Sequence, residues 1–137
     1  MPGMQPNDFD VKLSVALAVP ILAGEPEKVS MYSTKSGSKR IFQAADVPTP
    51  IAAYDIYDKH EFLNSLARLV AHNLFVNTWI FKIDDEFNGR GHAALSVDSI
   101  KTILELRKRK IEMTEPIIEK IQEVIQKVLP KKVKIAQ

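Results

Sequence analysis

Cysteine is absent from the 137 residues, so disulfide bonds and thiolate metal sites are excluded, and the composition suits a reducing compartment. No apolar run approaches the roughly 20 residues that a helix needs to cross a bilayer. The first eight residues are polar and place no basic stretch ahead of an apolar core, so we expect no secretory signal. Internal repeats and low-complexity segments are also absent. These absences favour a cytoplasmic globular protein without membrane attachment.

The residues that are present fit one globular domain with a modest core, because 45% are hydrophobic and 26% are charged. The formal net charge of +2 conceals an asymmetry. Residues 1–98 carry 9 Lys/Arg against 12 Asp/Glu, whereas residues 99–137 carry 10 against 5. A basic second part would attract an acidic partner such as nucleic acid or a tubulin surface, but a solvated helix face is the favoured interpretation.

The first half of the chain shows mixed helical and extended patterns. Its expected elements are a polar lead over 1–10, an ambiguous helix or strand over 11–18, a short buried strand over 19–22 and a helical stretch over 27–45. We expect the helical stretch to be interrupted at residues 36–38, around Gly37. Pro48 and Pro50 then favour an extended segment, because proline disfavours helix for itself and for the residue before it.

The middle of the chain carries clearer signals. Asp58 stands three residues before Glu61, which is the spacing of a capping box at the start of a helix. The apolar stripe of that helix consists of Phe62, Leu63, Leu66, Leu69 and Val70. Residues 79–83 are rich in β-branched and aromatic side chains and predict a strand, which the polar loop 84–91 connects to a second strand over 93–97.

The last part predicts two helices and a strand. The expected boundaries are a cap at Asp98 or Ser99 for a helix to about Lys110, an opening at Thr114 and Pro116 for the next helix, an end at Pro130 and a strand over 133–136. The second helix has a regular apolar stripe of Ile117, Ile118, Ile121, Val124, Ile125, Val128 and Leu129. Core packing against a sheet is the favoured interpretation of this stripe, and docking of a partner helix is the alternative.

The stretch that could carry chemistry begins on the strand over 79–83. Lys82 lies within this apolar strand, where burial is expensive unless the ammonium reaches an anion or solvent. Gly89, Arg90 and Gly91 follow, and glycines let a backbone approach a ligand while N–H groups and an arginine suit phosphate oxygens. Together these features suggest a flap over a polyphosphate. An ordinary hairpin with one outward-facing lysine is the equally weighted alternative.

A second basic stretch, over residues 33–42, reads Ser-Thr-Lys-Ser-Gly-Ser-Lys-Arg-Ile-Phe. It is not the GxxxxGK[ST] phosphate loop, and by itself it favours ordinary surface. Taken together, the order and spacing of the two stretches indicate a protein family more specifically than either stretch does alone. A small-residue turn with two prolines over 44–50 follows the first stretch, and the lysine-bearing strand with its glycine loop comes after an intervening helix.

In this order the segments resemble the ATP-grasp superfamily, the fold of D-alanine–D-alanine ligase, carbamoyl-phosphate synthetase and the tubulin-tyrosine-ligase-like enzymes. The resemblance covers roughly residues 19–97. Within it, the amino-acid sequence most resembles an ATP-grasp-like domain of cilium- and sperm-associated proteins. It implies an α/β fold with helices packed on a small mixed sheet, the N-terminal lobe of the superfamily. Residues 1–18 would form a polar lead and a remnant of a preceding domain, and residues 19–137 the lobe with its basic C-terminal helices.

The resemblance also implies a nucleotide site. Lys39 corresponds to the first nucleotide lysine of the superfamily, which reaches the ATP phosphates from a helix entry, and Lys82 corresponds to the second, on the strand. Gly89, Arg90 and Gly91 correspond to the flexible lid over the β- and γ-phosphates. Arg90 would add charge there, in a transfer that depends mostly on positioning and electrostatics. We therefore expect weak ATP binding.

Departures from the superfamily pattern argue against catalysis. Ile83 stands where the superfamily has proline, and Asp84, Asp85 and Glu86 bring negative charge into the loop. The Mg²⁺ ligands of the superfamily belong to a second lobe, which we expect to be absent here. Mg²⁺ binding is therefore not expected, and without it acyl-phosphate chemistry lacks the metal that neutralises developing charge.

Other candidate residues give weaker signals. Three scattered histidines show no metal-ligand spacing, so we expect no metal site from His60, His72 and His92. A basic cluster on the expected helix before residue 110 would suit a macromolecular partner, although a solvated face is favoured. Its members are Arg107, Lys108, Arg109 and Lys110.

The leading hypothesis is a non-catalytic ATP-grasp-like module without catalytic residues. By its resemblance it would be a structural or interaction component of a cilium or flagellum, with partners such as tubulin or axonemal proteins. The enzyme alternative is part of an ATP-dependent carboxylate–amine ligase that a further lobe or a partner chain completes. A third hypothesis is a basic-tailed adaptor for tubulin or nucleic acid. We expect other proteins as partners, rather than nucleic acid or a membrane.

Overall fold

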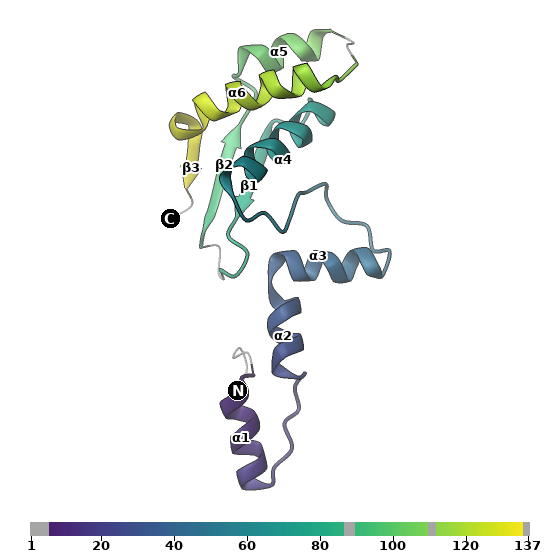
Figure 1. Cartoon of the computed structure of the whole chain (residues 1–137), viewed down its shortest axis with the longest axis vertical. Helices are drawn as coiled ribbons and strands as arrows, with labels where there is room; N and C mark the ends of the chain where they lie inside the picture. The colour runs from purple at the N-terminus through teal and green to yellow at the C-terminus, as the bar shows by residue number, and fades with distance from the viewer. Residues whose placement is uncertain (1–5, 87–89, 110–111, 136–137) are drawn as a thin grey trace. The chain divides into compact units, whose positions relative to one another are not determined.

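The computed structural model describes residues 6–86, 90–109 and 112–135, which contain six helices and three strands (Figure 1). The contacts divide the chain into two compact units, residues 1–49 and residues 50–137. Each unit is therefore described by itself. The unit boundary falls beside Pro50, within the segment that the prolines were expected to hold extended, and residues 47–57 indeed contain no helix or strand.

The first unit contains three helices, α1 (Asp8–Leu17), α2 (Pro26–Ser33) and α3 (Lys35–Ala44). Asn7 caps α1: its side chain accepts from the N–H groups of Phe9 and Asp10, and the Asp10 carboxylate accepts from the Asn7 N–H at 2.9 Å. The ambiguous segment 11–18 is thus helical up to Leu17. The short buried strand expected over 19–22 is wrong, since Leu22 is 99% exposed. The described residues of this unit offer no neighbouring strand that could satisfy its backbone groups.

The break between α2 and α3 lies at Thr34, not at residues 36–38 as the glycine suggests. The Thr34 hydroxyl accepts from the Gly37 N–H at 2.9 Å and so starts α3. Gly37 is needed for close packing, because a Cβ there would lie 2.1 Å from the Met31 carbonyl oxygen. The glycine therefore lets the first turn of α3 approach the end of α2, and the helix continues through it.

The second unit contains α4 (Lys59–His72), β1 (Thr78–Lys82), β2 (His92–Ser96), α5 (Lys101–Lys108), α6 (Glu115–Lys132) and β3 (Val133–Ile135). The strands form one sheet in the order β1-β2-β3. Helices α4 and α6 pack against each other, and α6 also contacts α5 and β2 (Figure 1). The α/β class is confirmed. Both strand pairings are antiparallel, so within the described residues the sheet is not the mixed one that was expected.

Helix α4 begins as its sequence predicts. The Asp58 carboxylate accepts from the Glu61 N–H at 2.8 Å, which confirms the cap. The Glu61 carboxylate accepts from the Tyr57 N–H at 2.9 Å, one residue before the cap, so the reciprocal bond differs from that of a capping box. The expected apolar stripe then faces the core, with Leu63, Leu66 and Val70 buried.

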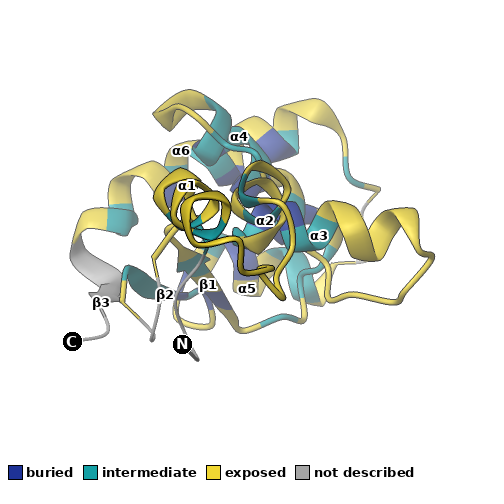
Figure 2. Ribbon diagram, turned by 90° about the horizontal axis from the view of Figure 1, so that it is seen from below, coloured by how far each residue is buried: buried dark blue, intermediate teal, exposed yellow. Residues whose placement is uncertain are grey.

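The core of the second unit lies between the helices and one face of the sheet. Ile118, Ile121 and Ile125 of α6 are buried together with residues of α4, β1 and β2. Core packing is therefore the confirmed interpretation of the α6 stripe. Figure 2 shows the contrast with α1, which is exposed along most of its length. Helix α1 has no buried residue.

Two expected helix boundaries in this unit are wrong. Helix α5 has Ile100 as its N-cap without a side-chain cap, because the Asp98 carboxylate instead accepts from the Ser96 hydroxyl. Helix α6 continues through Pro130 to Lys132. Proline removes one N–H donor and crowds the preceding turn, and here only two helical residues follow it, so its effect is confined to the last turn.

The burial pattern predicts that Ile121→Ala lowers the free energy of unfolding by about 2–5 kcal/mol, because Ile121 is fully buried and its removal leaves a cavity. Ile80→Ala is the matched control, since this isoleucine is 63% exposed and its change should stay within about 0.5 kcal/mol. Urea unfolding followed by the fluorescence of Trp79, the single tryptophan, measures both. Equal effects of the two changes would contradict this core.

Candidate nucleotide-binding site

The β1–β2 hairpin presents two different faces. Trp79 and Phe81 of β1 point toward the helices, and the Phe81 ring meets the Phe62 ring of α4 edge-on at 5.1 Å between centroids. Successive residues of a strand point to opposite faces, so Ile80 and Lys82 point away from the core. Both are exposed. Lys82 is therefore solvated at the end of its strand and carries no burial cost.

The loop end of the hairpin is tightly closed. The Ile83 N–H donates to the Gly91 carbonyl oxygen at 3.0 Å, and Lys82 lies opposite His92 in the register. Gly91 has a φ of +64°, which disfavours any residue with a Cβ, and a Cβ there would lie 2.8 Å from the Ile83 side chain. A glycine at position 91 therefore favours this closure. Its predicted companion Gly89 lies outside the described residues.

Charges of both signs gather at this end of the hairpin. Arg90 is exposed beside Gly91, and Lys82 ends the neighbouring strand. Asp84, Asp85 and Glu86 are also exposed in the same loop. An incoming phosphate would meet two cations here, with three carboxylates near them.

Lys39, the other predicted nucleotide lysine, lies in the middle of α3 and is half-buried. It belongs to the first unit, whereas Lys82 and Arg90 belong to the second. The predicted convergence of Lys39 and Lys82 on one pocket therefore stays a prediction. The described hairpin brings together Lys82, Arg90 and Gly91 alone.

The basic cluster on α5 is divided by the structure. The Arg107 guanidinium donates to the carbonyl oxygens of Leu74 at 2.5 Å and Val76 at 3.4 Å, and the side chain is half-buried. Arg107 therefore holds the segment between α4 and β1. Lys108 and Arg109 are exposed and remain candidates for an interaction surface. Lys110, the fourth member, lies outside the described residues.

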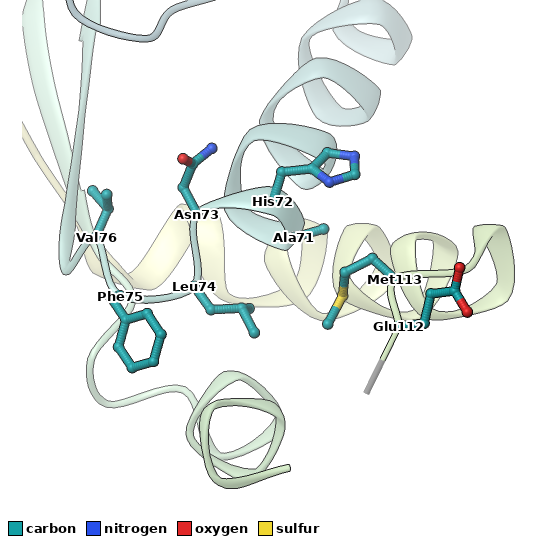
Figure 3. A pocket seen from close by; sticks show the side chains of 8 residues that line it. All are labelled: Ala71, His72, Asn73, Leu74, Phe75, Val76, Glu112 and Met113. Carbon is teal, nitrogen blue, oxygen red and sulfur yellow. The ribbon is translucent and has the colours of Figure 1, made fainter. Parts of the chain in front are cut away.

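An open groove of about 640 Å³ lies beside the segment that Arg107 holds (Figure 3). In that view Phe75 and Val76 stand at one end, and His72, Met113 and Glu112 stand at the other. Ala71, Asn73 and Leu74 complete the lining. Phe75 is 84% exposed, and the carbonyl groups of the residues on both sides of it accept hydrogen bonds from Arg107.

The sequence analysis missed this groove, and it contains none of the predicted site residues. Its sequence signal is Phe75, an aromatic residue in the turn Asn73–Phe75 between helix and strand. Among the residues that the structure describes, no group of three or more metal-binding side chains is found. Within the same ranges, no helix is both long and apolar enough to span a membrane.

The packing of helices on a sheet gives the chain an α/β fold, and Lys82 lies on a strand, as the resemblance to the ATP-grasp superfamily implies. A model of the family described as IQCH-like, ATP-grasp, matches residues 26–137, and the chain belongs to this family. The chain is also similar to IQ motif-containing protein H of Danio rerio, with 41% identity over 93 residues. That match covers 68% of this chain and 9% of the relative's length. No solved structure matches the chain.

The closure of the hairpin predicts the behaviour of Gly91→Ala. We expect it to destabilise the loop end by about 1–3 kcal/mol, because alanine must adopt a positive φ and its Cβ would clash with Ile83. Hydrogen exchange of the Ile83 amide measures the effect and should become faster. Adding Ile83→Ala removes the contacts with the Ile83 Cγ1 and Cδ1 but keeps the contact with its Cβ, so it should recover only part of the protection. Unchanged exchange in Gly91→Ala would contradict the close approach.

The bonds from α5 predict that Arg107→Ala lowers the free energy of unfolding by about 1–3 kcal/mol, since it leaves two half-buried carbonyl groups without their charged donor. Lys108→Ala is the control because the neighbouring side chain is exposed, and it should change stability by less than about 0.5 kcal/mol. Urea unfolding of both variants provides the measurement. A surface role for the whole cluster would instead make the two changes equivalent.

Proposed function

We propose that this chain is a non-catalytic ATP-grasp-like module, a structural or interaction component that retains weak nucleotide binding. The observation that carries the proposal is the exposed pair Lys82 and Arg90 at the closed end of a hairpin. Membership of the ATP-grasp family supports a nucleotide as the ligand of this pair.

The outer face of the hairpin has the chemistry that a nucleotide needs. Ile80 is 63% exposed and lies two residues before Lys82 on the same face, opposite Ala94 of β2. Residues i and i+2 of a strand lie roughly 6–7 Å apart. A base stacked on Ile80 would therefore place its phosphates toward Lys82 and Arg90, which provide donors for the phosphate oxygens.

The same loop explains why the binding would be weak. Asp84, Asp85 and Glu86 are exposed close to the two cations, so the local charge does not favour a polyanion. We propose that ATP binds without a Mg²⁺ site of the chain's own. Phosphoryl and acyl-phosphate chemistry depends on metal bridging of phosphate oxygens, and the hairpin itself provides binding groups only.

The structural role is supported by surfaces that the core does not use. The groove beside Phe75 and the exposed Lys108 and Arg109 are available to another protein. A protein partner such as tubulin or an axonemal protein, and a location in a cilium or flagellum, are proposed from the sequence resemblance. The enzyme alternative, an ATP-dependent carboxylate–amine ligase completed by further residues or a partner chain, is supported by the family membership.

Calorimetric titration of the chain with ATP, with and without Mg²⁺, tests the nucleotide part. We expect weak binding that salt reduces, and we expect Lys82→Ala and Arg90→Ala each to weaken it about tenfold by removing a charged donor. Lys101→Ala is the control, because this lysine is exposed on α5, away from the hairpin. The variants should keep the unfolding midpoint of the unmodified chain.

Two results would decide against the proposal. Absence of heat at high protein concentration, or equal binding by the chain and Lys82→Ala, would remove the nucleotide part. Formation of ADP in the presence of a carboxylate and an amine would favour the ligase alternative.

A further inference from the structure

His92 lies directly opposite Lys82 across the β1–β2 hairpin. Leu95 of β2 is buried, and side chains alternate along a strand, so His92 three residues earlier points to the outer face. The Ile83 N–H donates to the Gly91 carbonyl oxygen, which makes the adjacent pair a non-hydrogen-bonded one. In pairs of this kind the Cα atoms are about 4.5 Å apart and the side chains are closest. The imidazole and the ammonium therefore lie side by side.

Three nitrogen-bearing side chains at this end of the hairpin lack a protein partner. Within residues 6–86, 90–109 and 112–135, the side chains of Lys82, Arg90 and His92 form no hydrogen bond or ion pair. His92 is half-buried, whereas the other two are exposed. A protonated imidazole is a donor at both ring nitrogens. His92 therefore offers a donor on a short side chain that a strand holds in place.

The charges around His92 come from the neighbouring strands and the loop, since the helices pack on the opposite face of the sheet. Lys82 faces it from β1, Arg90 belongs to the loop, and β3 has Lys134 at the register position opposite Ala94. The carboxylates of the loop are Asp84, Asp85 and Glu86. In the hairpin and its loop, two cations thus stand against three carboxylates while His92 is neutral. Protonation of the imidazole makes the two numbers equal.

We propose that His92 is a third phosphate-binding side chain of the candidate site and that its protonation controls the affinity for the nucleotide. This inference rests on the proposed binding of a nucleotide at Lys82 and Arg90. Imidazole side chains gain a proton in the range of about pH 8 to pH 5. The protonated ring donates to a phosphate oxygen beside the Lys82 ammonium and offsets one loop carboxylate.

The position opposite Lys82 gives this control its physical basis. Like charges directly opposite each other on two strands repel, so a protonated His92 and Lys82 disfavour each other in the free chain. A phosphate that accepts from both side chains removes this repulsion. Binding of the proton and of the nucleotide therefore strengthen each other, and each raises the affinity for the other by the same factor.

Calorimetric titration of the full chain with ATP, without Mg²⁺, tests the role of His92 at about pH 6 and about pH 8. We expect His92→Gln to bind ATP about tenfold more weakly than the unmodified chain at the lower pH and equally at the higher pH, because glutamine gains no charge. ATP itself titrates in this range, and comparing the two proteins at the same pH cancels that effect. His72→Gln is the matched control, since His72 is exposed at the end of α4 and lines the groove instead.

A permanent charge and a proton count separate this role from a purely structural one. His92→Lys should bind ATP about tenfold more tightly than the unmodified chain at about pH 8, because its charge does not depend on a proton there. Titrations near neutral pH in buffers of different ionisation enthalpy measure the protons taken up on binding. The unmodified chain should take up more than His92→Gln, whereas equal uptake would show that His92 does not gain a proton with the ligand.

The outcomes distinguish this inference from the proposal on which it rests. ATP binding with the same pH dependence in the unmodified chain and in His92→Gln would overturn the role of His92 and leave the nucleotide site in place. Absence of ATP binding at both pH values would overturn both. The near-ultraviolet circular dichroism of Trp79, which is buried in the second unit, verifies that each variant remains folded.

Discussion

The packing of α4 and α6 on one face of the sheet is the interaction on which the second unit depends. Leu95, Ile121 and Ile125 are fully buried, and they hold the inner face of the hairpin together with Trp79. A one-residue shift in register would exchange the two faces of each strand, so this burial fixes Ile80 and Lys82 on the outer face. The exposed ion pair between Arg68 and Glu115 adds little, since solvent screens it. Apolar packing therefore determines where the charges of the candidate site lie.

The first unit is organised by different forces. Its helices begin at Asn7, Pro26 and Thr34, which are local signals, and side-chain caps contribute about 1 kcal/mol each. Helices of eight to ten residues are marginal in water without an apolar face packed against something. Among residues 6–49, no large apolar side chain is buried, so the local signals there lack the tertiary support that α4 receives.

The sequence predicted those elements whose local signal agreed with their tertiary role. Asp58, the stripe of α4 and the aromatic strand around Trp79 located α4 and β1 within a residue or two, because pattern and burial coincide there. Local patterns failed where a distant or competing contact determines the local structure. Asp98 is one such case, because its carboxylate accepts from the Ser96 hydroxyl and α5 has no side-chain cap. The role of Arg107 could not be predicted either, since its acceptors lie 31 and 33 residues away. Likewise, the groove beside Phe75 exists only after α4 and the segment before α6 come together.

At the candidate site, the charged groups and the apolar surface would contribute differently to the binding of a ligand. Two cations, Lys82 and Arg90, stand near the three carboxylates of residues 84–86, so electrostatic attraction alone would not hold a triphosphate. The exposed side chain of Ile80 offers a contact that repulsion does not reduce, and burial of its apolar area is favourable whatever the charge of the ligand. In the proposed complex the base would therefore supply the larger share of the binding free energy, and the two cations would orient the phosphates. Under the proposal, apolar contact with the base and charged contacts with the phosphates would thus act at separate places on the same face of the hairpin.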